Sequence, residues 1–92
     1  MPDSYAAYYE PGPNWLAGKS LKEQPLKSHV EYLVSLHKKG KLSMGGPLAD
    51  GSGGLAIFTA EDQEEAQTMV SLDPAIESGI LVAVVKKWSR IV

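Results

Sequence analysis

The chain has 92 residues, a formal net charge of −2 and 43% hydrophobic residues, a composition typical of an ordinary folded domain. It has no cysteine, which excludes disulfide bonds, thiolate zinc sites and a cysteine nucleophile. No basic excess indicates nucleic-acid binding, no apolar run approaches the roughly 20 residues of a membrane span, and no secretory signal is visible. We therefore expect one domain over residues 1–92 that is cytoplasmic and binds neither nucleic acid nor membrane.

The first element expected is a strand over residues 4–10, a short aromatic and apolar segment. Pro11 and Gly12 end it. Residues 15–24 have no clear hydrophobic period and are expected to form a loop. Trp15 in this loop has two interpretations, a lid over the edge of the core or one wall of a ligand pocket.

Residues 25–39 are expected to form a helix, with Pro25 at the first helical position and Gly40 just past the end. Apolar residues recur at helical spacing and predict a buried stripe. The stripe consists of Leu26, Val30, Leu33, Val34 and His37. His29 lies in the first turn, beside this stripe.

Residues 41–48 are expected to form the second strand. Gly45, Gly46 and Pro47 weaken it as a central strand, because proline cannot donate a ladder hydrogen bond, so it is placed at an edge. A glycine-rich turn then leads to a third strand over residues 55–59, and the two make a hairpin.

The second helix is expected to begin after Thr59 as N-cap, with Asp62 approximating a capping box, and to end near Ser71. The acidic residues in its first turns favour a solvated helix face over a metal site. Residues 80–85 are apolar throughout and form the strongest predicted strand.

The predicted order is strand, helix, strand, strand, helix, strand. This is a ferredoxin-like βαββαβ unit, an α+β fold with a four-stranded antiparallel sheet. Both helices cover one face of the sheet. Because the last strand is apolar at consecutive positions, as if buried on both sides, we expect a homodimer whose sheets pack face to face.

This topology places segments that are far apart in the sequence at one end of the sheet. His29, the Gly45-Gly46-Pro47 segment and Asp73 all converge there. A carboxylate on one ring nitrogen would fix the tautomer of His29, and the other nitrogen would act as general base or acid. The two glycines would let backbone N–H groups approach a ligand.

Each of these features also has a structural interpretation. His29 fits a half-buried helix residue, Asp73 before Pro74 fits an N-cap, and the glycines fit a β-bulge. His37 is interpreted as structural. Because His29 and His37 have no third ligand near them in sequence, we expect no metal.

Several short segments, taken together, resemble the YciI-like (YCII-related) domain family. They are His29 followed by Tyr32, Leu33 and Leu36; Gly40-Lys41-Leu42 running into Gly45-Gly46-Pro47; Leu72-Asp73-Pro74; and residues 77–80 leading to the last strand and Trp88. The resemblance implies a dimeric α/β barrel with an active site built on a His–Asp pair, which maps to His29 and Asp73. Proteins related to this family or built on similar barrels include a dehydrochlorinase, isomerases and small monooxygenases. The loop over residues 11–24, with Trp15, departs from the family pattern.

Three functions fit these observations. The first is a cofactor-independent enzyme, of lyase, dehydrochlorinase or isomerase type, acting on a small oxygenated or aromatic molecule. In it His29 and Asp73 would be catalytic, and Trp15, Gly45, Gly46 and Pro47 would bind the ligand. The second is a non-catalytic dimer with a small-ligand-binding or regulatory role. The third is a plain interaction module.

Overall fold

The computed structural model describes residues 3–92; the expected domain also included residues 1–2, which lie outside this range. Within residues 3–92, four strands, two longer helices and two short helical turns follow one another. In chain order they are β1 (Asp3–Pro11), η1 (Leu21–Glu23), α1 (Lys27–Lys38), β2 (Leu42–Pro47), β3 (Gly54–Ala60), α2 (Gln63–Ser71), α3 (Pro74–Glu77) and β4 (Leu81–Lys87).

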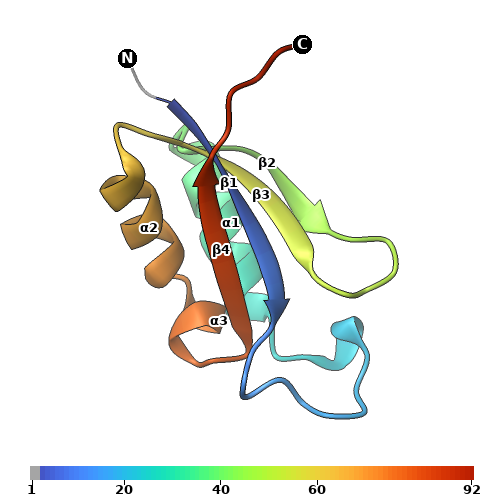
Figure 1. The fold of residues 1–92 in the computed structure, drawn as a ribbon. Coiled ribbons are helices and arrows are strands. Elements are labelled where there is room, and N and C mark those ends of the chain that lie inside the picture. The colour runs from blue at the N-terminus through green and yellow to red at the C-terminus, as the bar shows by residue number, and fades with distance from the viewer. Residues whose placement is uncertain (1–2) are drawn as a thin grey trace.

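The strands form one antiparallel sheet in the order β2-β3-β1-β4, and the helices lie together on one of its faces (Figure 1). This is the ferredoxin-like α+β topology expected from the sequence, with β2 at one edge and β4 beside β1. Since β2 and β1 both pair antiparallel to β3, they run in the same direction. The end of β2 and the end of β1 therefore meet at the same end of the sheet.

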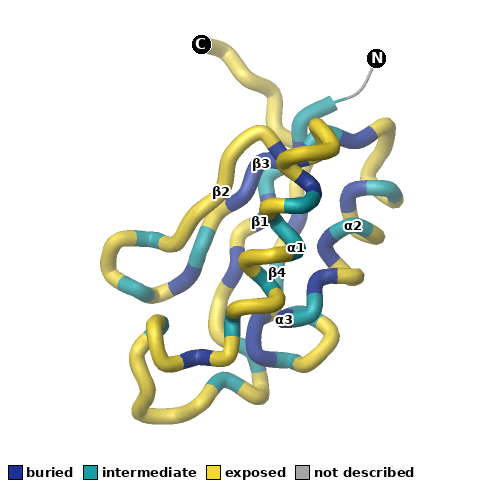
Figure 2. The backbone as a smooth tube through the Cα atoms, turned by 180° about the vertical axis from the view of Figure 1, so that it is seen from behind, coloured by how far each residue is buried: buried dark blue, intermediate teal, exposed yellow. Residues whose placement is uncertain are grey.

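The core lies between the sheet and the helices, and side-chain size sets how closely they approach. Ala7 on β1 and Ala66 on α2 are fully buried, and they leave room for Phe58 and Val70, which are 0% and 1% exposed. Small residues under a helix allow the close packing that native interiors reach. Figure 2 shows α2 with buried segments facing the sheet, whereas α1 is mostly exposed or intermediate.

The helix α1 begins at Lys27, so the prediction that Pro25 is its first residue is wrong. Gln24 is buried, and its side chain bonds the backbone of Leu16 and Lys19, which holds the chain extended just before the proline. A residue that precedes proline also prefers extended conformations. The helix can therefore start only after the chain has left this anchor, with Leu26 as N-cap.

Thr59 was also wrong as the N-cap of the second helix. It is still a strand residue, because β3 continues to Ala60 and Thr59 donates its N–H to the Lys41 carbonyl at 2.8 Å. The N-cap is Asp62, whose Oδ1 accepts the Glu65 N–H at 2.8 Å. The local capping pattern allows either Thr59 or Asp62 as the N-cap. Because Thr59 is held in strand β3, the helix begins after Asp62.

The last strand is not buried on both sides in the single chain. Leu81 and Val85 are buried under the helices, but Val82 and Val84 are 45% and 49% exposed on the opposite, helix-free face. Pairing places Tyr8 beside Val84 on that face. Face-to-face packing of two sheets remains a prediction. No helix within residues 3–92 is long and apolar enough to cross a membrane.

Candidate active site

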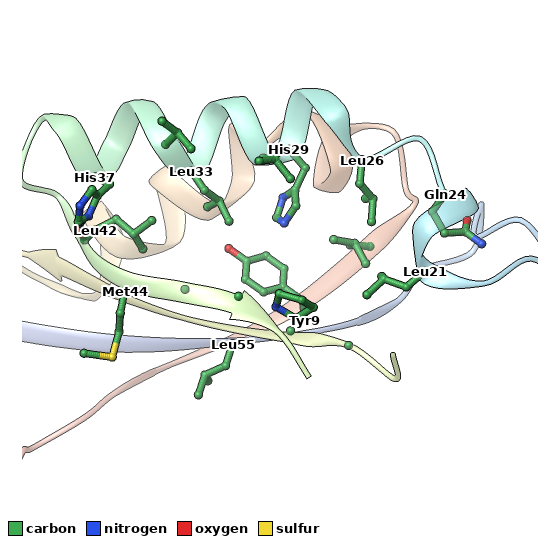
Figure 3. Close-up of a pocket in the computed structure, with 18 of the residues that line it drawn as sticks. Tyr9, Leu21, Gln24, Leu26, His29, Leu33, His37, Leu42, Met44 and Leu55 are labelled. Carbon is green, nitrogen blue, oxygen red and sulfur yellow. Dashed lines mark hydrogen bonds between the residues drawn. The ribbon is translucent and has the colours of Figure 1, made fainter. Parts of the chain in front are cut away.

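A cavity of about 810 Å³ lies between α1 and the β2–β3 hairpin, and its lining runs from Leu42 at the start of β2 to Pro47 at its end (Figure 3). Side chains of α1 form one wall, the β2 backbone forms another, and Tyr9 of β1 and Leu21 of η1 contribute to the rest. Most of the lining is apolar, as is usual for a small-molecule site.

The apolar stripe predicted for the first helix lines this cavity. All of its members are lining residues: Leu26, Val30, Leu33, Val34 and His37. Val30 and Val34 are 55% and 46% exposed, so the prediction that they are buried is wrong, and the buried residue of α1 is Leu36. The His37 Nδ1–H donates to the Leu42 carbonyl at 2.8 Å, which agrees with a structural role.

Gly45, Gly46 and Pro47 line the cavity from the end of β2. At Gly45 an added Cβ would lie 3.3 Å from the Cβ of Ala56, so glycine keeps this part of the wall thin. The strand irregularity lies between Leu42 and Met44 rather than at the glycines. The glycines therefore shape the wall, and their role in binding a ligand remains a prediction.

His29 and Asp73 are in direct contact although 44 residues separate them. His29 Nδ1 lies 2.5 Å from Asp73 Oδ2, and the side chains are 12% and 0% exposed. The other carboxylate oxygen, Oδ1, accepts the Ala75 N–H at 2.9 Å and caps α3. Asp73 therefore makes both of the expected contacts, since one oxygen caps a helix and the other holds an imidazole; its catalytic role remains a prediction.

The partners of the His29 ring assign its two nitrogens different roles. An ionised carboxylate only accepts, so Nδ1 carries the proton and donates it to Asp73. In the neutral form of this tautomer the lone pair is on Nε2, and among residues 3–92 the hydrogen bond of the ring is the one from Nδ1 to Asp73. The ring lines the cavity and points from α1 toward Tyr9 (Figure 3). Such an imidazole can accept a proton from a bound molecule.

Tyr9 is a site residue that was not predicted from the sequence. It is 2% exposed, it lines the cavity, and its ring meets the His29 ring edge to face with centroids 5.3 Å apart. Burial raises the pKa of the Tyr9 hydroxyl, and the charge of Asp73 raises it further. In the structure, strand alternation turns Tyr9 toward the helices, and its partner in β3 is Gly54, which has no side chain to cover it.

Trp15 is not one of the cavity-lining residues found in the described part of the chain. It packs against the core, and its loop is fixed to the chain before β4. Asn14 donates its backbone N–H to Gly79 and its side-chain N–H to Ser78, at 2.8 and 2.7 Å. This placement fits a lid over the edge of the core; a contact between Trp15 and a ligand remains a prediction.

The charged residues that line the cavity are basic. They are Lys22 and Lys27, and no lining residue in the described range is acidic. Within residues 3–92, no cluster of three or more His, Asp or Glu side chains is arranged to hold a metal ion. The two lysines make the potential at this wall of the cavity positive.

Comparison with known proteins identifies the family. Residues 4–89 match the model of the YCII-related domain, and the chain belongs to this family. It is 30% identical over 70 residues to the uncharacterized protein YjpA of Bacillus subtilis (strain 168), a match that spans 76% of this chain and 82% of YjpA.

A solved structure supports the fold. The chain is similar to 5-chloro-2-hydroxyhydroquinone dehydrochlorinase (TftG) from Burkholderia phenoliruptrix AC1100, in complex with 2,5-dihydroxybenzoquinone. The TM-score is 0.67 at 23% sequence identity, and the match covers 95% of this chain and 94% of the other. At this identity the likeness concerns the fold alone.

Proposed function

We propose that this protein is a cofactor-independent enzyme in which His29 is the general acid/base and Asp73 orients it. The substrate would be a small oxygenated or aromatic molecule, and the reaction a lyase, dehydrochlorinase or isomerase step. One observation carries the proposal: a fully buried carboxylate holds one nitrogen of an imidazole whose ring lines an apolar cavity.

The chemistry follows from the two ring nitrogens. Nε2 of His29 takes a proton from a C–H or O–H group of the substrate, and the electron pair of that bond forms a new double bond. In an elimination the leaving group departs with its own electron pair; in an isomerisation His29 returns the proton to another carbon. Asp73 stabilises the imidazolium that forms meanwhile. Proton transfer of this kind contributes roughly 10²–10⁴-fold to a rate.

The backbone at the end of β2 would stabilise negative charge that develops on the substrate. Because β2 is an edge strand, some of its N–H groups are not needed for the sheet. Donors placed beside a developing oxyanion provide a large part of many enzymes' catalysis. Gly45 and Gly46 allow close approach at this point, and Pro47 ends the strand.

The similar dehydrochlorinase supports the reaction class. Its ligand, 2,5-dihydroxybenzoquinone, is a small ring that carries several oxygens, and its name describes a lyase-type reaction. The cavity of this chain has the apolar walls that such a ring would contact.

The test is a screen of small phenols, hydroxyquinones and their halogenated analogues, first by thermal shift and then by product analysis in D₂O. Turnover that is lost in His29→Ala and His29→Gln is the expected result. An isomerisation should incorporate solvent deuterium at carbon, whereas an elimination should not. Binding that survives His29→Ala, with no turnover of any bound compound, would favour the non-catalytic ligand-binding alternative.

Asp73→Asn separates the orienting role of Asp73 from its capping role. Asparagine keeps an oxygen that can accept the Ala75 N–H, but it presents an N–H₂ donor to His29 and so reverses the tautomer. ¹⁵N NMR of the His29 ring should find the proton on Nδ1 in the wild type and on Nε2 in the variant. A proton on Nε2 in the wild type would contradict the proposed role of Asp73.

We propose further that two copies pack through their helix-free sheet faces. Large apolar side chains on that face are 40–62% exposed: Tyr8, Met44, Leu55, Val82 and Val84. Sedimentation at micromolar concentration should find a dimer for the wild type and a monomer for Val84→Asp. Leu72→Asp, at a position 56% exposed in the turn between α2 and α3, is the control and should remain dimeric.

A further inference from the structure

We propose that Tyr9 is a second ligand-contacting group, whose hydroxyl donates a hydrogen bond to an oxygen of the molecule held beside His29. The inference deepens the function proposed above and rests on it for the identity of the site. It assigns the substrate class more narrowly, to compounds in which an acceptor oxygen lies next to the proton that His29 removes. Enolisable carbonyl compounds, phenols and hydroxyquinones have this arrangement.

The first argument is that the Tyr9 hydroxyl has no partner. Of the side-chain polar atoms that are buried in the described part of the chain, only this oxygen has no hydrogen bond. Buried hydroxyl groups nearly always find a partner, so the orphan hydroxyl of a residue that lines the cavity points to a bond that forms only when the cavity is filled. Tyr32, close by on α1, shows the contrast, since its hydroxyl donates to the Met69 carbonyl at 2.6 Å.

The second argument is position. Tyr9 and His29 line the same cavity from opposite elements, β1 and α1, and their rings meet edge to face at 5.3 Å. Figure 3 shows the Tyr9 hydroxyl pointing up between the sheet and α1, close to the His29 ring. A ligand oxygen placed against Tyr9 would therefore hold the neighbouring atom of the ligand near His29.

The third argument concerns protonation. Burial and the nearby charge of Asp73 both disfavour the phenolate, so the pKa of the Tyr9 hydroxyl lies above its usual value. Tyr9 is thus a neutral donor at physiological pH and does not compete with His29 as a base. The two groups divide the work: His29 moves the proton, and Tyr9 stabilises the oxygen on which charge develops.

The test compares two ring-shaped probes in Tyr9→Phe, with Tyr5→Phe as the matched control. Tyr5 lies on the same strand and the same face, is 3% exposed, and does not line the cavity. The probes are 2,5-dihydroxybenzoquinone, which offers oxygens, and p-xylene, which offers none. Calorimetry should find the oxygenated probe about tenfold weaker in Tyr9→Phe, the loss of one hydrogen bond, and p-xylene changed less than about twofold. Tyr5→Phe should change neither.

A direct readout accompanies the affinities. The ¹³Cζ resonance of Tyr9 should move when wild type binds the oxygenated probe and stay in place with p-xylene. Equal affinity of wild type and Tyr9→Phe for the oxygenated probe overturns this inference alone. Selective weakening in Tyr9→Phe upholds it even where no compound is turned over, which would defeat only the proton-transfer proposal. A wild type that binds neither probe at millimolar concentration overturns both.

Discussion

The two main helices cover the same face of one sheet in different ways. Helix α2 seals the sheet beneath it, since Ala66 and Val70 are 0% and 1% exposed. Helix α1 buries only Leu36 and turns its apolar stripe toward a cavity, with Val30 and Val34 about half exposed. Beneath α2 the side chains fill the space, whereas beside α1 the strand β2 ends in two glycines and a proline.

The region under α2 therefore contributes mainly to stability, and the region beside α1 contains the candidate site. The sealed region provides Asp73, a fully buried carboxylate, and the open region provides His29 and the space for a ligand. Their hydrogen bond joins the two regions. Segments that bind ligands commonly come from the less stable parts of a fold, and here a fully buried group holds the imidazole that is proposed to move a proton.

The largest effect is expected where the two regions meet. Asp73→Ala removes the partner of His29 and the cap of α3, leaving a buried Ala75 N–H without an acceptor, and should cost about 2–4 kcal/mol of unfolding free energy. Asp62→Ala removes the exposed cap of α2 and should cost about 1 kcal/mol. Urea titration of both variants measures the difference. Equal costs would mean that the link between the regions adds nothing to stability.

The next prediction compares the helices through one substitution. Val70→Ala, in the sealed region, should cost about 2 kcal/mol, because it removes two buried methyl groups and leaves a cavity. Val34→Ala, beside the cavity and 46% exposed, should cost less than about 0.5 kcal/mol. The midpoints of denaturant unfolding decide the matter. A comparable loss at Val34 would contradict the view that α1 leaves its stripe unpacked.

The sequence predicted the fold well because each of its signals concerns periodicity or connection. Short apolar or aromatic runs bounded by turn residues defined the strands, and the strand–helix–strand order allowed few right-handed topologies. The same topology predicted that His29 and Asp73 meet, since it requires only that the start of α1 and the end of α2 lie at one end of the sheet. No local motif was needed for either result.

These signals could not predict the cavity or the place of Tyr9 in it, for a physical reason. An apolar stripe has the same period whether it packs on side chains or lines an empty space, so Val30 and Val34 were indistinguishable from core residues. A tyrosine in a strand reads as core until the atoms around its hydroxyl are known. The start of α1 also depended on the hydrogen bonds between the Gln24 side chain and the preceding loop. No local sequence pattern contains these bonds.

The smallest expected effect tests whether water is excluded from around Tyr9 beside the cavity. Since the pKa of Tyr9 is raised by burial, folded protein keeps this proton above about pH 10, where an unfolded tyrosine releases it. The folded state then binds more protons than the unfolded state, so stability falls as pH rises, by up to about 1.4 kcal/mol per pH unit from this group. The unfolding free energy of Tyr9→Phe should differ from that of wild type by a constant amount between pH 7 and roughly pH 9. By roughly pH 11 the variant should have lost about 1 kcal/mol less of its unfolding free energy than wild type. Parallel curves over the whole range would mean that water fills the cavity around Tyr9, and that the open region differs from the sealed one in solvent content as well as in packing.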